Sequence, residues 1–459
     1  MFHCRKEIGS RSRPDWRIGF AIMLMLLLAA AGMAQVDPGP RGGPAVAAGV
    51  PIAGGGAGNP IAGLTAGEKD FFKNVATPTF AEVETVAAGL GPRFNLDSCA
   101  GCHIQPAQGG SSPRVNPQFA RAGTMAPGNH IPFFVTPNGP IREVRFIRNA
   151  DGTPDGGVHD IFTIAGRADK PFGCSIQQPD FQHQAANNNI IFRIPTPTFG
   201  AGLIEEITDT TIRNNVASDP DGRKRAFGIS GRVNTNGNDG TVTRFGWKAQ
   251  NKSLMIFAGE AYNVEMGVTN ENFNTEREED PRCATNGTPE SDFGFNVGSI
   301  RASDITAFRA FMRFLDQPTP VTSFDSVSAS SIANGRNLFS VVGCALCHTP
   351  TLMTGNSSTA ALSNKAANLF SDLAIHNMGS GLADGVSQGT AGPSEFRTAP
   401  LWGVGQRIFF LHDGRTSDLL QAILAHDSPG SEAVHVIDNF QFNLSRQQQQ
   451  DILNFLRSL

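Results

Sequence analysis

Two copies of one short pattern, Cys-x-x-Cys-His, constrain this chain more than any other feature. The first copy occupies residues 99–103 and the second residues 344–348. In such a string, two thiols bond covalently to the vinyl groups of a haem and the adjacent histidine ligates its iron. The pattern predicts four thioether bonds and two proximal iron ligands. The candidate residues are Cys99, Cys102 and His103 in the first copy and Cys344, Cys347 and His348 in the second.

The competing interpretation is that each copy is half of a zinc site. A structural zinc ion needs four ligands close together, so the two distant C-x-x-C pairs would have to meet in space. A histidine at the same position in both copies would then be a coincidence. An export signal and a helix leading into each copy both favour haem over zinc.

The N-terminal residues 1–34 read as an export signal. Basic residues between positions 5 and 17 precede an uninterrupted apolar run, 18–33, that ends in small residues before Gln35. We expect a mature chain that begins near Gln35, in the periplasm or otherwise exported. An uncleaved anchor is the alternative, because the run is barely long enough to span a bilayer. No later segment is long and apolar enough to be a membrane helix.

Length and charge bound the remaining possibilities. The 459 residues, 40% of them hydrophobic, are enough for two or three domains with real cores. A formal net charge of -4, with no long basic run after the N-terminus, gives no electrostatic surface for nucleic acid. Of the seven cysteines, Cys4 leaves with the signal and four belong to the two copies. The remaining two, Cys174 and Cys283, are most simply paired in an oxidising compartment.

The hydrophobic pattern predicts a mainly α fold with extensive loops and a few short β-strands. A Pro/Gly/Ala-rich stretch, 35–64, reads as a flexible linker. Helical periodicity over 77–91 and again over 332–342 places a helix before each Cys-x-x-Cys-His copy. Residues 110–300 read as irregular loops with short β pieces. Helix returns at 303–318, and a capping box at Ser445 and Gln448 opens a closing helix.

A second internal match follows each copy. "FRIPTPTFGAG" at 192–202 and "FRTAPLWGVG" at 396–405 share Phe-Arg and then Pro-x-aromatic-Gly-x-Gly, with one residue of difference in the spacer. The same two patterns in the same order indicate a duplicated module, of which the first carries a long insertion. Because the match is short, chance remains the alternative.

The sixth iron position decides between electron transfer and catalysis, because a protein ligand there makes a carrier and an open face makes a catalyst. For the second haem the candidate is His426, on the buried face of a short helix that ends before Pro429. A histidine that only interacts with the helix dipole is the alternative, and His376 and Met378 are rival ligands. For the first haem no residue stands out. The histidines and the methionine that follow it in loop-like sequence are Met125, His130, His159 and His183.

Several motifs in family order resemble the di-haem oxidoreductase and peroxidase family, also labelled thiol oxidoreductases. They are "PRFNLDSCAGCH", "FRIPTPTFGAGLIEEI", "RFGWKAQNKSL", "CALCHTP", "DLAIHNMGSGLADG", "FRTAPLWGVG" and "FFLHDGRTSDLLQAILAH". The resemblance covers about residues 65–459 and extends more distantly to bacterial di-haem cytochrome c peroxidases and MauG-type enzymes. It implies two cytochrome c-like domains, at 65–320 with the long insertion and at 321–459.

The resemblance also implies a division of labour between two covalently bound haem c groups. The C-terminal haem would be the low-spin electron-transfer centre, with His426 where the peroxidases have a methionine. The N-terminal haem would react with peroxide, and Glu205 in "GLIEEI" would be the catalytic glutamate that moves protons near its distal face. An adjacent pair of solvated carboxylates is the alternative for Glu205. Trp247 and Trp402 are candidates for the electron route, and His412 matches a family position with a supporting role.

Two functions therefore stand side by side. The first is an exported di-haem oxidoreductase that takes electrons from a small redox protein or other donor and reduces hydrogen peroxide or oxidises a substrate. The second is a non-enzymatic electron carrier with both irons six-coordinate, the first closed by a residue such as His130 or Met125. A weaker third interpretation makes residues 110–300 a partner-binding module. No motif settles whether calcium binds as well.

Overall fold

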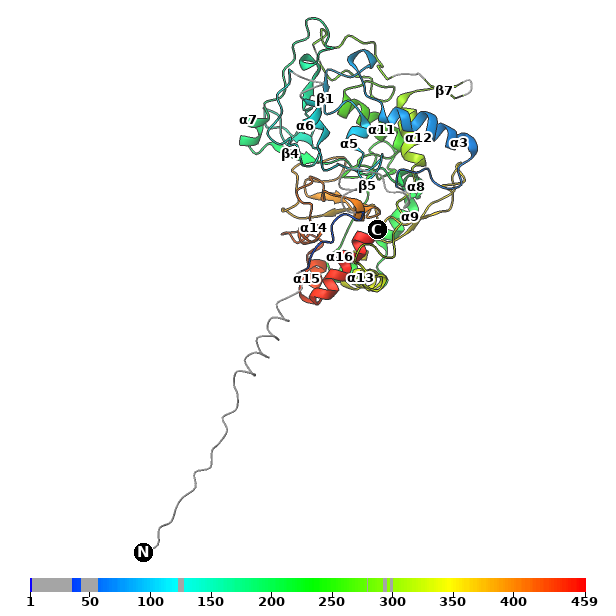
Figure 1. Cartoon of the computed structure of the whole chain (residues 1–459), viewed down its shortest axis with the longest axis vertical. Coiled ribbons are helices and arrows are strands. Elements are labelled where there is room, and N and C mark those ends of the chain that lie inside the picture. The colour runs from blue at the N-terminus through cyan, green and yellow to red at the C-terminus, as the bar shows by residue number, and fades with distance from the viewer. Residues whose placement is uncertain (2–34, 43–56, 123–127, 279, 292–294, 298–299) are drawn as a thin grey trace.

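The computed structural model of the chain describes residue 1 and residues 35–42, 57–122, 128–278, 280–291, 295–297 and 300–459. The expected export signal thus lies outside the described residues, except for Met1. Figure 1 shows α3, α11 and α12 in one half of the molecule and α13, α15 and α16 in the other, close to the C-terminus.

The described helices and strands are mostly short. The helices are α3 (Ala66–Phe71), η1 (Phe72–Ala76), α4 (Thr77–Ala81), η2 (Val86–Ala88), α5 (Cys99–Cys102), α6 (Pro117–Ala122), η3 (Ile164–Gly166), α7 (Phe181–Ala186), α8 (Ala201–Glu206), α9 (Asp209–Ala217), α10 (Arg223–Ala226), α11 (Leu254–Met266), α12 (Asp304–Phe314), α13 (Ala329–Val342), η4 (Cys344–Leu346), η5 (Val404–Gln406), α14 (Leu419–Leu424), α15 (Val434–Phe442) and α16 (Arg446–Ser458). The strands are β1 (Arg93–Phe94), β2 (Glu143–Phe146), β3 (Phe162–Thr163), β4 (Ile190–Arg193), β5 (Asn234–Thr235), β6 (Val242–Thr243), β7 (Phe295–Val297), β8 (Ile300–Ala302), β9 (Leu352–Met353), β10 (Ala366–Ala367), β11 (Ile375–Asn377) and β12 (Glu395–Arg397).

The fold of the described residues is mixed, with many short helices and only short strands. The described strands pair antiparallel in twos: β1 with β3, β2 with β4, β5 with β6, β7 with β8, β9 with β10, and β11 with β12. Helices with extensive loops and a few short strands are therefore confirmed. The division into two cytochrome c-like domains stays a prediction.

Helix α11 is the longest of the described helices that the sequence pattern missed. It lies inside the region expected to be loops, and its sequence, "LMIFAGEAYNVEM", is apolar on nearly every side. A helix without a polar face gives no amphipathic stripe, so periodicity does not reveal it. Among the described residues, no helix combines the length and apolar character that crossing a bilayer requires.

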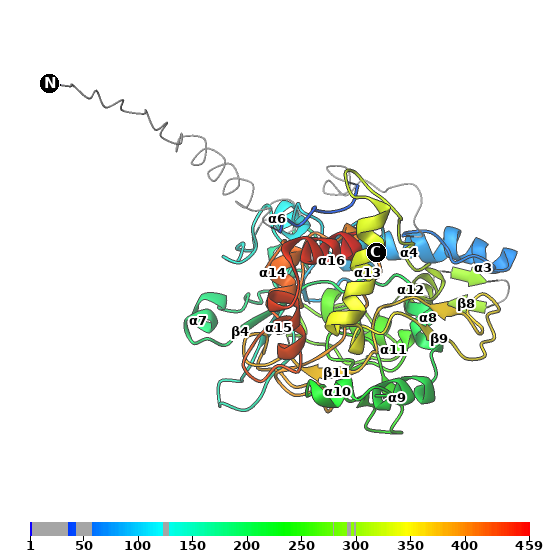
Figure 2. The same ribbon diagram turned by 90° about the horizontal axis from the view of Figure 1, so that it is seen from below.

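Helices α13 and α16 pack closely against each other in the second half of the structure (Figure 2). The residues predicted to share one face of α13 are all buried: Ile332, Gly335, Leu338, Phe339 and Val342. A Cβ atom at Gly335 would lie 1.8 Å from the backbone oxygen of Asp451 in α16, so only glycine permits this crossing. The predicted capping box of α16 is present as well, with Ser445 and Gln448 bonding each other's backbone.

The predicted helix before the first Cys-x-x-Cys-His copy is wrong beyond Ala81. The helical run α3–η1–α4 starts earlier, at Ala66, and ends where Glu82 takes an extended ψ of 145°. Val83, expected on the buried face, is 45% exposed. The hydroxyl of Thr85 accepts from the backbone of Ala88 and starts the separate short turn η2. Local capping therefore overrides the apolar periodicity of this segment.

The start of the expected linker is bound to the C-terminal helix. Both oxygens of Asp37 accept hydrogen bonds from the buried guanidinium of Arg457, at 2.6 and 2.5 Å, and one also accepts from the backbone of Leu419 at 2.7 Å. The Arg41 side chain donates to the backbone oxygen of Leu459 at 3.3 Å. Residues 35–42 are thus part of the folded structure.

A disulfide bond joins Cys174 and Cys283, whose Cα atoms lie 4.7 Å apart. It closes a loop with a sequence separation of 109 residues across the region poor in regular structure. The pairing that export and cysteine counting favoured is the one observed.

Candidate functional site

The first Cys-x-x-Cys-His copy forms a single helical turn, α5, followed by a tight loop. The His103 backbone N–H donates to the Cys99 oxygen at 3.0 Å and closes this turn. The ring Nδ1 lies 3.0 Å from the backbone oxygen of Gly110. Because a carbonyl only accepts, Nδ1 carries the proton and Nε2 keeps its lone pair. A Cβ atom at Gly110 would lie 2.0 Å from the Gln105 oxygen, so glycine makes this loop possible.

The second copy repeats this construction. Gly343, with φ of 112°, ends α13 and turns the chain into η4, and the His348 backbone N–H donates to the Cys344 oxygen at 2.9 Å. Its ring Nδ1 lies 2.9 Å from the backbone oxygen of Phe370, so again Nε2 is free. Burial lowers the pKa of His348 to about 4, which keeps the ring neutral and able to ligate a metal.

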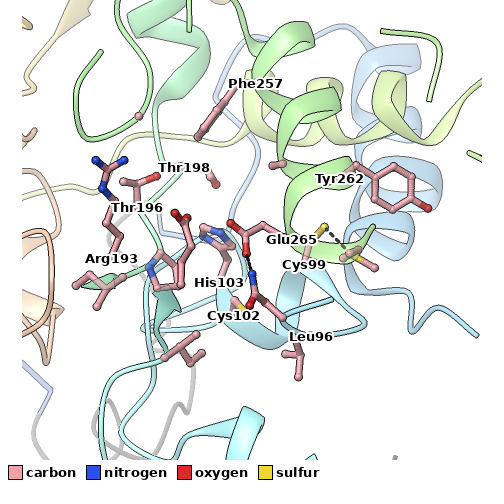
Figure 3. Close-up of a pocket in the computed structure, with 18 of the residues that line it drawn as sticks. Leu96, Cys99, Cys102, His103, Arg193, Thr196, Thr198, Phe257, Tyr262 and Glu265 are labelled. Atoms are coloured by element: carbon pink, nitrogen blue, oxygen red, sulfur yellow. Dashed lines mark hydrogen bonds between the residues drawn. The ribbon is translucent and has the colours of Figure 1, made fainter. Parts of the chain in front are cut away.

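Each copy lines its own cavity. The first cavity encloses about 1100 Å³ of empty space and is bordered by Cys99, Cys102, His103, Glu143, Arg193 and Glu265 among others. Figure 3 shows the labelled side chains around it. The second cavity encloses about 1420 Å³ and is bordered by Cys344, Cys347, His348, His426 and many apolar side chains. The side chain of Trp247 lines both cavities.

His426 lies on the wall of the second cavity together with His348. It follows α14, and its Nδ1 lies 2.8 Å from the backbone oxygen of Ala422, one helical turn earlier. Nδ1 is therefore protonated, and Nε2 is available to a metal. Burial lowers the pKa of both His426 and His348. The proximity of His426 lowers the pKa of His348 further, because two neighbouring rings resist being protonated together. The structure thus brings the two predicted ligands of the second haem to one cavity.

The rival His376 also lines the second cavity, but both of its ring nitrogens are occupied. Nε2 lies 3.0 Å from the Asp372 carboxylate and Nδ1 lies 2.7 Å from the Glu432 carboxylate. Burial disfavours the charged ring, but Cys347 and Asp372 outweigh burial and raise the pKa of His376 well above its ordinary value. An imidazolium with two carboxylate partners has no lone pair for iron, which leaves His426 as the better candidate. Met378 borders the same cavity.

Among the described residues that line the first cavity, His103 is the single histidine. His130 borders a different pocket, which Cys174 also lines. His159 bonds the Asp155 carboxylate at 2.8 Å, His183 bonds Asn187, and neither lines the first cavity. Met125 lies outside the described residues. Two thioethers that the sequence did not single out, Met266 and Met312, do line the cavity.

Glu205 does not lie on the wall of the first cavity. Its carboxylate pairs with Arg313 of α12, and one oxygen accepts from the backbone of Leu254 at 2.9 Å, at the start of α11. The neighbouring Glu206 pairs with the same guanidinium. The structure thus uses both carboxylates to join α8 to α12 and α11. A catalytic role for Glu205 stays an untested prediction.

Two other carboxyl groups line the first cavity and were missed by the sequence analysis. Glu143 of β2 and Glu265 of α11 share a hydrogen bond. Burial would raise the pKa of Glu143, but the charges of Arg145 and Arg193 outweigh it and lower that pKa. Burial and the Glu143 charge raise the pKa of Glu265 well above its ordinary value. Glu265 is therefore the protonated donor and Glu143 the ionised acceptor.

Zinc does not fit this geometry. Among the described residues, the one group of three Cys, His, Asp or Glu whose ligand atoms all lie within 4.8 Å of one another is Cys347, Asp372 and His376. Neither copy gathers its own two sulfur atoms and its histidine nitrogen around a single point, and the two copies line different cavities. Burial also raises the pKa of Cys99 to about 12, which opposes the thiolate that zinc requires.

Comparison with protein families decides the relationship. The profile of the family described as "Di-haem oxidoreductase, putative peroxidase" matches residues 144–459. The chain belongs to this family. Its members carry haem cofactors, and the residues present fit two of them, because each cavity holds two cysteines and a neutral histidine with a free Nε2. A planar macrocycle uses such separated donors, whereas a bare ion needs converging ones.

Solved structures show only weak similarity to this di-haem oxidoreductase. A MauG-like protein associated with microbial copper homeostasis aligns with a TM-score of 0.28 and 16% identity, over 58% of this chain and 89% of its own. A hydrazine synthase of Kuenenia stuttgartiensis aligns with a TM-score of 0.26 and 17% identity, over 44% of this chain and 60% of its own. The chain thus spans 60% of that synthase chain. No curated protein matches the sequence.

Proposed function

We propose that the protein is an exported di-haem c-type cytochrome with peroxidase-like activity, in which the haem of the second motif passes electrons to the haem of the first. The observation that carries the proposal is the difference between the two cavities. The second holds His348 and His426, whose Nδ1 atoms bond backbone oxygens and leave Nε2 free, together with a third neutral histidine, His412. The first holds one histidine and a carboxyl pair.

The second cavity is suited to electron transfer. Both His348 and His426 would hold this haem, and a haem held by two protein ligands would serve electron transfer rather than substrate binding. Cys344 and Cys347 would attach the macrocycle covalently. Two imidazoles lower the potential relative to an imidazole and a thioether, because thioether sulfur favours the reduced iron.

The first cavity is suited to peroxide chemistry. His103 would hold this haem, and the bound haem would supply the electrons for reductive cleavage of a peroxide bond. Reduction of one hydrogen peroxide to two water molecules consumes two electrons and two protons. Glu265 holds a proton on the cavity wall and can donate it, and the Glu143 carboxylate accepts from Glu265 and can return a proton to it.

The path between the cavities runs past Trp247. Its side chain lines both, and the indole N–H donates to the backbone oxygen of Ile194 at 2.9 Å, which fixes the ring. Trp402 borders a smaller cavity of about 570 Å³ that also touches Trp247. We assign Trp247 the closer place on the electron route, because it is in contact with both sites.

In this proposal residues 65–320 form the first cytochrome c-like unit, with the long insertion, and residues 321–459 form the second. Electrons come from a small redox protein or another donor outside the cell's cytoplasm. The family membership supports the di-haem oxidoreductase chemistry, and the export signal supports the location.

A non-enzymatic electron carrier is the second candidate, favoured by one observation. Met266 and Met312 line the first cavity, and a thioether from either would close the iron there. Absorption and EPR spectra of the holo-protein, with and without hydrogen peroxide, separate the two functions. One high-spin and one low-spin iron, with the high-spin signal altered by peroxide, support the enzyme. Two low-spin irons whose spectra do not change on addition of hydrogen peroxide support the carrier.

A further inference from the structure

Two buried arginines at the wall of the second cavity have no counter-charge. Arg397 and Arg407 are 9% and 7% exposed, and both border the second cavity and the smaller cavity beside Trp247. Arg397 donates through Nε to the backbone oxygen of Gly246 at 2.9 Å. The Nε and one terminal nitrogen of Arg407 have no hydrogen-bond partner among the described residues. Burial alone lowers the pKa of each to about 10, with no acidic group opposing it.

Most other buried arginines among the described residues have carboxylate partners, and the exception is Arg41, which donates to the backbone oxygen of Leu459. Arg193 pairs with Asp384 at 2.7 Å, and Arg457 pairs with Asp37 at 2.5 Å. Arg313 pairs with the carboxylates of α8. A buried cation without a partner is strongly destabilising, so proteins keep one where a bound anion supplies the missing charge. Arg397 and Arg407 differ from these paired arginines because they have no acidic partner and both line a cavity large enough for a ligand.

Arg193 and Arg397 occupy the same position in the internal sequence match. Arg193 of the first repeat lines the first cavity, and Arg397 of the second repeat lines the second. The repeat glycines also act alike: a Cβ atom at Gly202 or Gly405 would lie 2.0 Å from a backbone oxygen of the closing helix of its own half, α12 or α16. In each half, the glycine turn of the repeat therefore packs closely against a helix, and the arginine of the repeat lines a cavity.

The two repeats differ in charge. The Asp384 carboxylate neutralises Arg193, and no acid does so for Arg397 among the described residues. In addition, Arg407 follows the last repeat glycine by two residues, and the matching place in the first repeat holds the apolar Ile204. The second cavity thus carries two buried arginines without an acidic partner. Of the arginines that line the first cavity, Arg193 pairs with Asp384 and Arg145 pairs with Glu143, whereas Arg142 lies over the ring of Phe192.

We propose that Arg397 and Arg407 bind the propionate carboxylates of the haem in the second cavity, an inference that rests on the proposed di-haem function. A haem carries two propionates, and a guanidinium matches a carboxylate with two parallel N–H donors. The Arg397 backbone N–H donates to the Trp247 oxygen at 2.8 Å. The carboxylate edge of the second haem would therefore point toward Trp247 and the first cavity, and the two cations would favour the more electron-rich, reduced haem.

The test compares the holo-protein with the variants Arg397→Met, Arg407→Met and Arg407→Lys, with Arg446→Gln as the control because Arg446 is exposed on α16. The mass of the denatured protein first establishes that two haems are present, and their absence would refute the di-haem function rather than the arginine assignment. The readouts are then the resonance Raman propionate bending modes and the reduction potential of the low-spin haem.

We expect both Met variants to shift the propionate modes and to move the potential to a more negative value. Arg407→Lys keeps the charge without the paired donors, so it should shift the modes and leave the potential near that of the wild type. Arg446→Gln should change neither readout. Unchanged modes and potential in both Met variants that still carry two haems would overturn the assignment. A potential that instead follows added phosphate, with unchanged propionate modes, would show a free-anion site and overturn it as well.

Discussion

His348 and His426 line the same cavity from different elements, and each places its Nδ1 beside a backbone oxygen, of Phe370 at 2.9 Å and of Ala422 at 2.8 Å. The hydrogen bonds fix both rings in the tautomer that offers Nε2 to a metal. This shared arrangement supports the proposal that both histidines hold the haem of the second cavity.

Replacing His426 with alanine should convert the second iron from low spin to high spin, because the variant removes one strong-field axial ligand and leaves His348 in place. EPR and absorption spectra of the holo-protein measure the change. His435→Ala is the matched control, since this histidine is exposed on α15. A low-spin signal that survives in the His426 variant would mean that another residue fills the axial position.

Replacing Glu265 with glutamine should lower the rate of peroxide reduction by about 10²- to 10⁴-fold, because the amide cannot give up a proton to the peroxide. Steady-state turnover with a reduced donor measures the loss. Glu271→Gln, on an exposed position just after α11, is the control and should keep the wild-type rate.

The variant Glu205→Gln tests which of the two glutamates, Glu205 or Glu265, is catalytic. Because Glu205 is bound to Arg313, this variant should lower thermal stability and reduce the rate by less than about tenfold. A larger loss of rate in the Glu205 variant than in the Glu265 variant would show that Glu205, and not Glu265, is the catalytic residue.

Replacing Asp37 with alanine should lower the free energy of unfolding by about 3–5 kcal/mol, because it leaves the fully buried guanidinium of Arg457 without a counter-charge. Chemical denaturation of the holo-protein measures the difference. Asp70→Ala, which removes an exposed carboxylate bonded to Asn74, should cost much less. A loss below about 1 kcal/mol for the Asp37 variant would show that residues 35–42 contribute little to the fold.

The same ion pair should give stability a specific dependence on pH. Burial would raise the pKa of Asp37, but Arg457 outweighs it and holds the pKa below its ordinary value of 3.8. A carboxyl group with a depressed folded pKa contributes stability above its unfolded pKa and loses it as pH falls through the folded pKa. The stability difference between wild type and Asp37→Asn should therefore be constant near neutral pH and shrink below about pH 4. A difference that grows on acidification would contradict this assignment.

The features that the sequence predicted well are those with a strong local signal. Helices α13 and α16 have a single apolar face, and α16 has a capping box, so periodicity and capping suffice to find them. The location of His426 on the second cavity follows from the same logic, since it extends the buried face of α14. Its role as an iron ligand stays a prediction for the spectra described above.

The features that the sequence did not predict depend on contacts between distant segments. Glu143 and Glu265 belong to elements far apart in the chain, and only the fold joins them. The two glutamates of the mainly apolar helix α11, Glu260 and Glu265, were the signal that could have pointed to Glu265. Asp37 lies in a stretch whose composition is typical of a flexible linker. Composition cannot reveal that this one carboxylate pairs with the buried Arg457 of α16.

The most direct test of the account is the mass of the purified, denatured protein, measured together with its visible spectrum. The covalent attachment through Cys99, Cys102, Cys344 and Cys347 predicts a mass greater than that of the processed polypeptide by two haem groups, with the red chromophore retained after denaturation. A mass equal to that of the polypeptide alone, with no chromophore, would contradict the account.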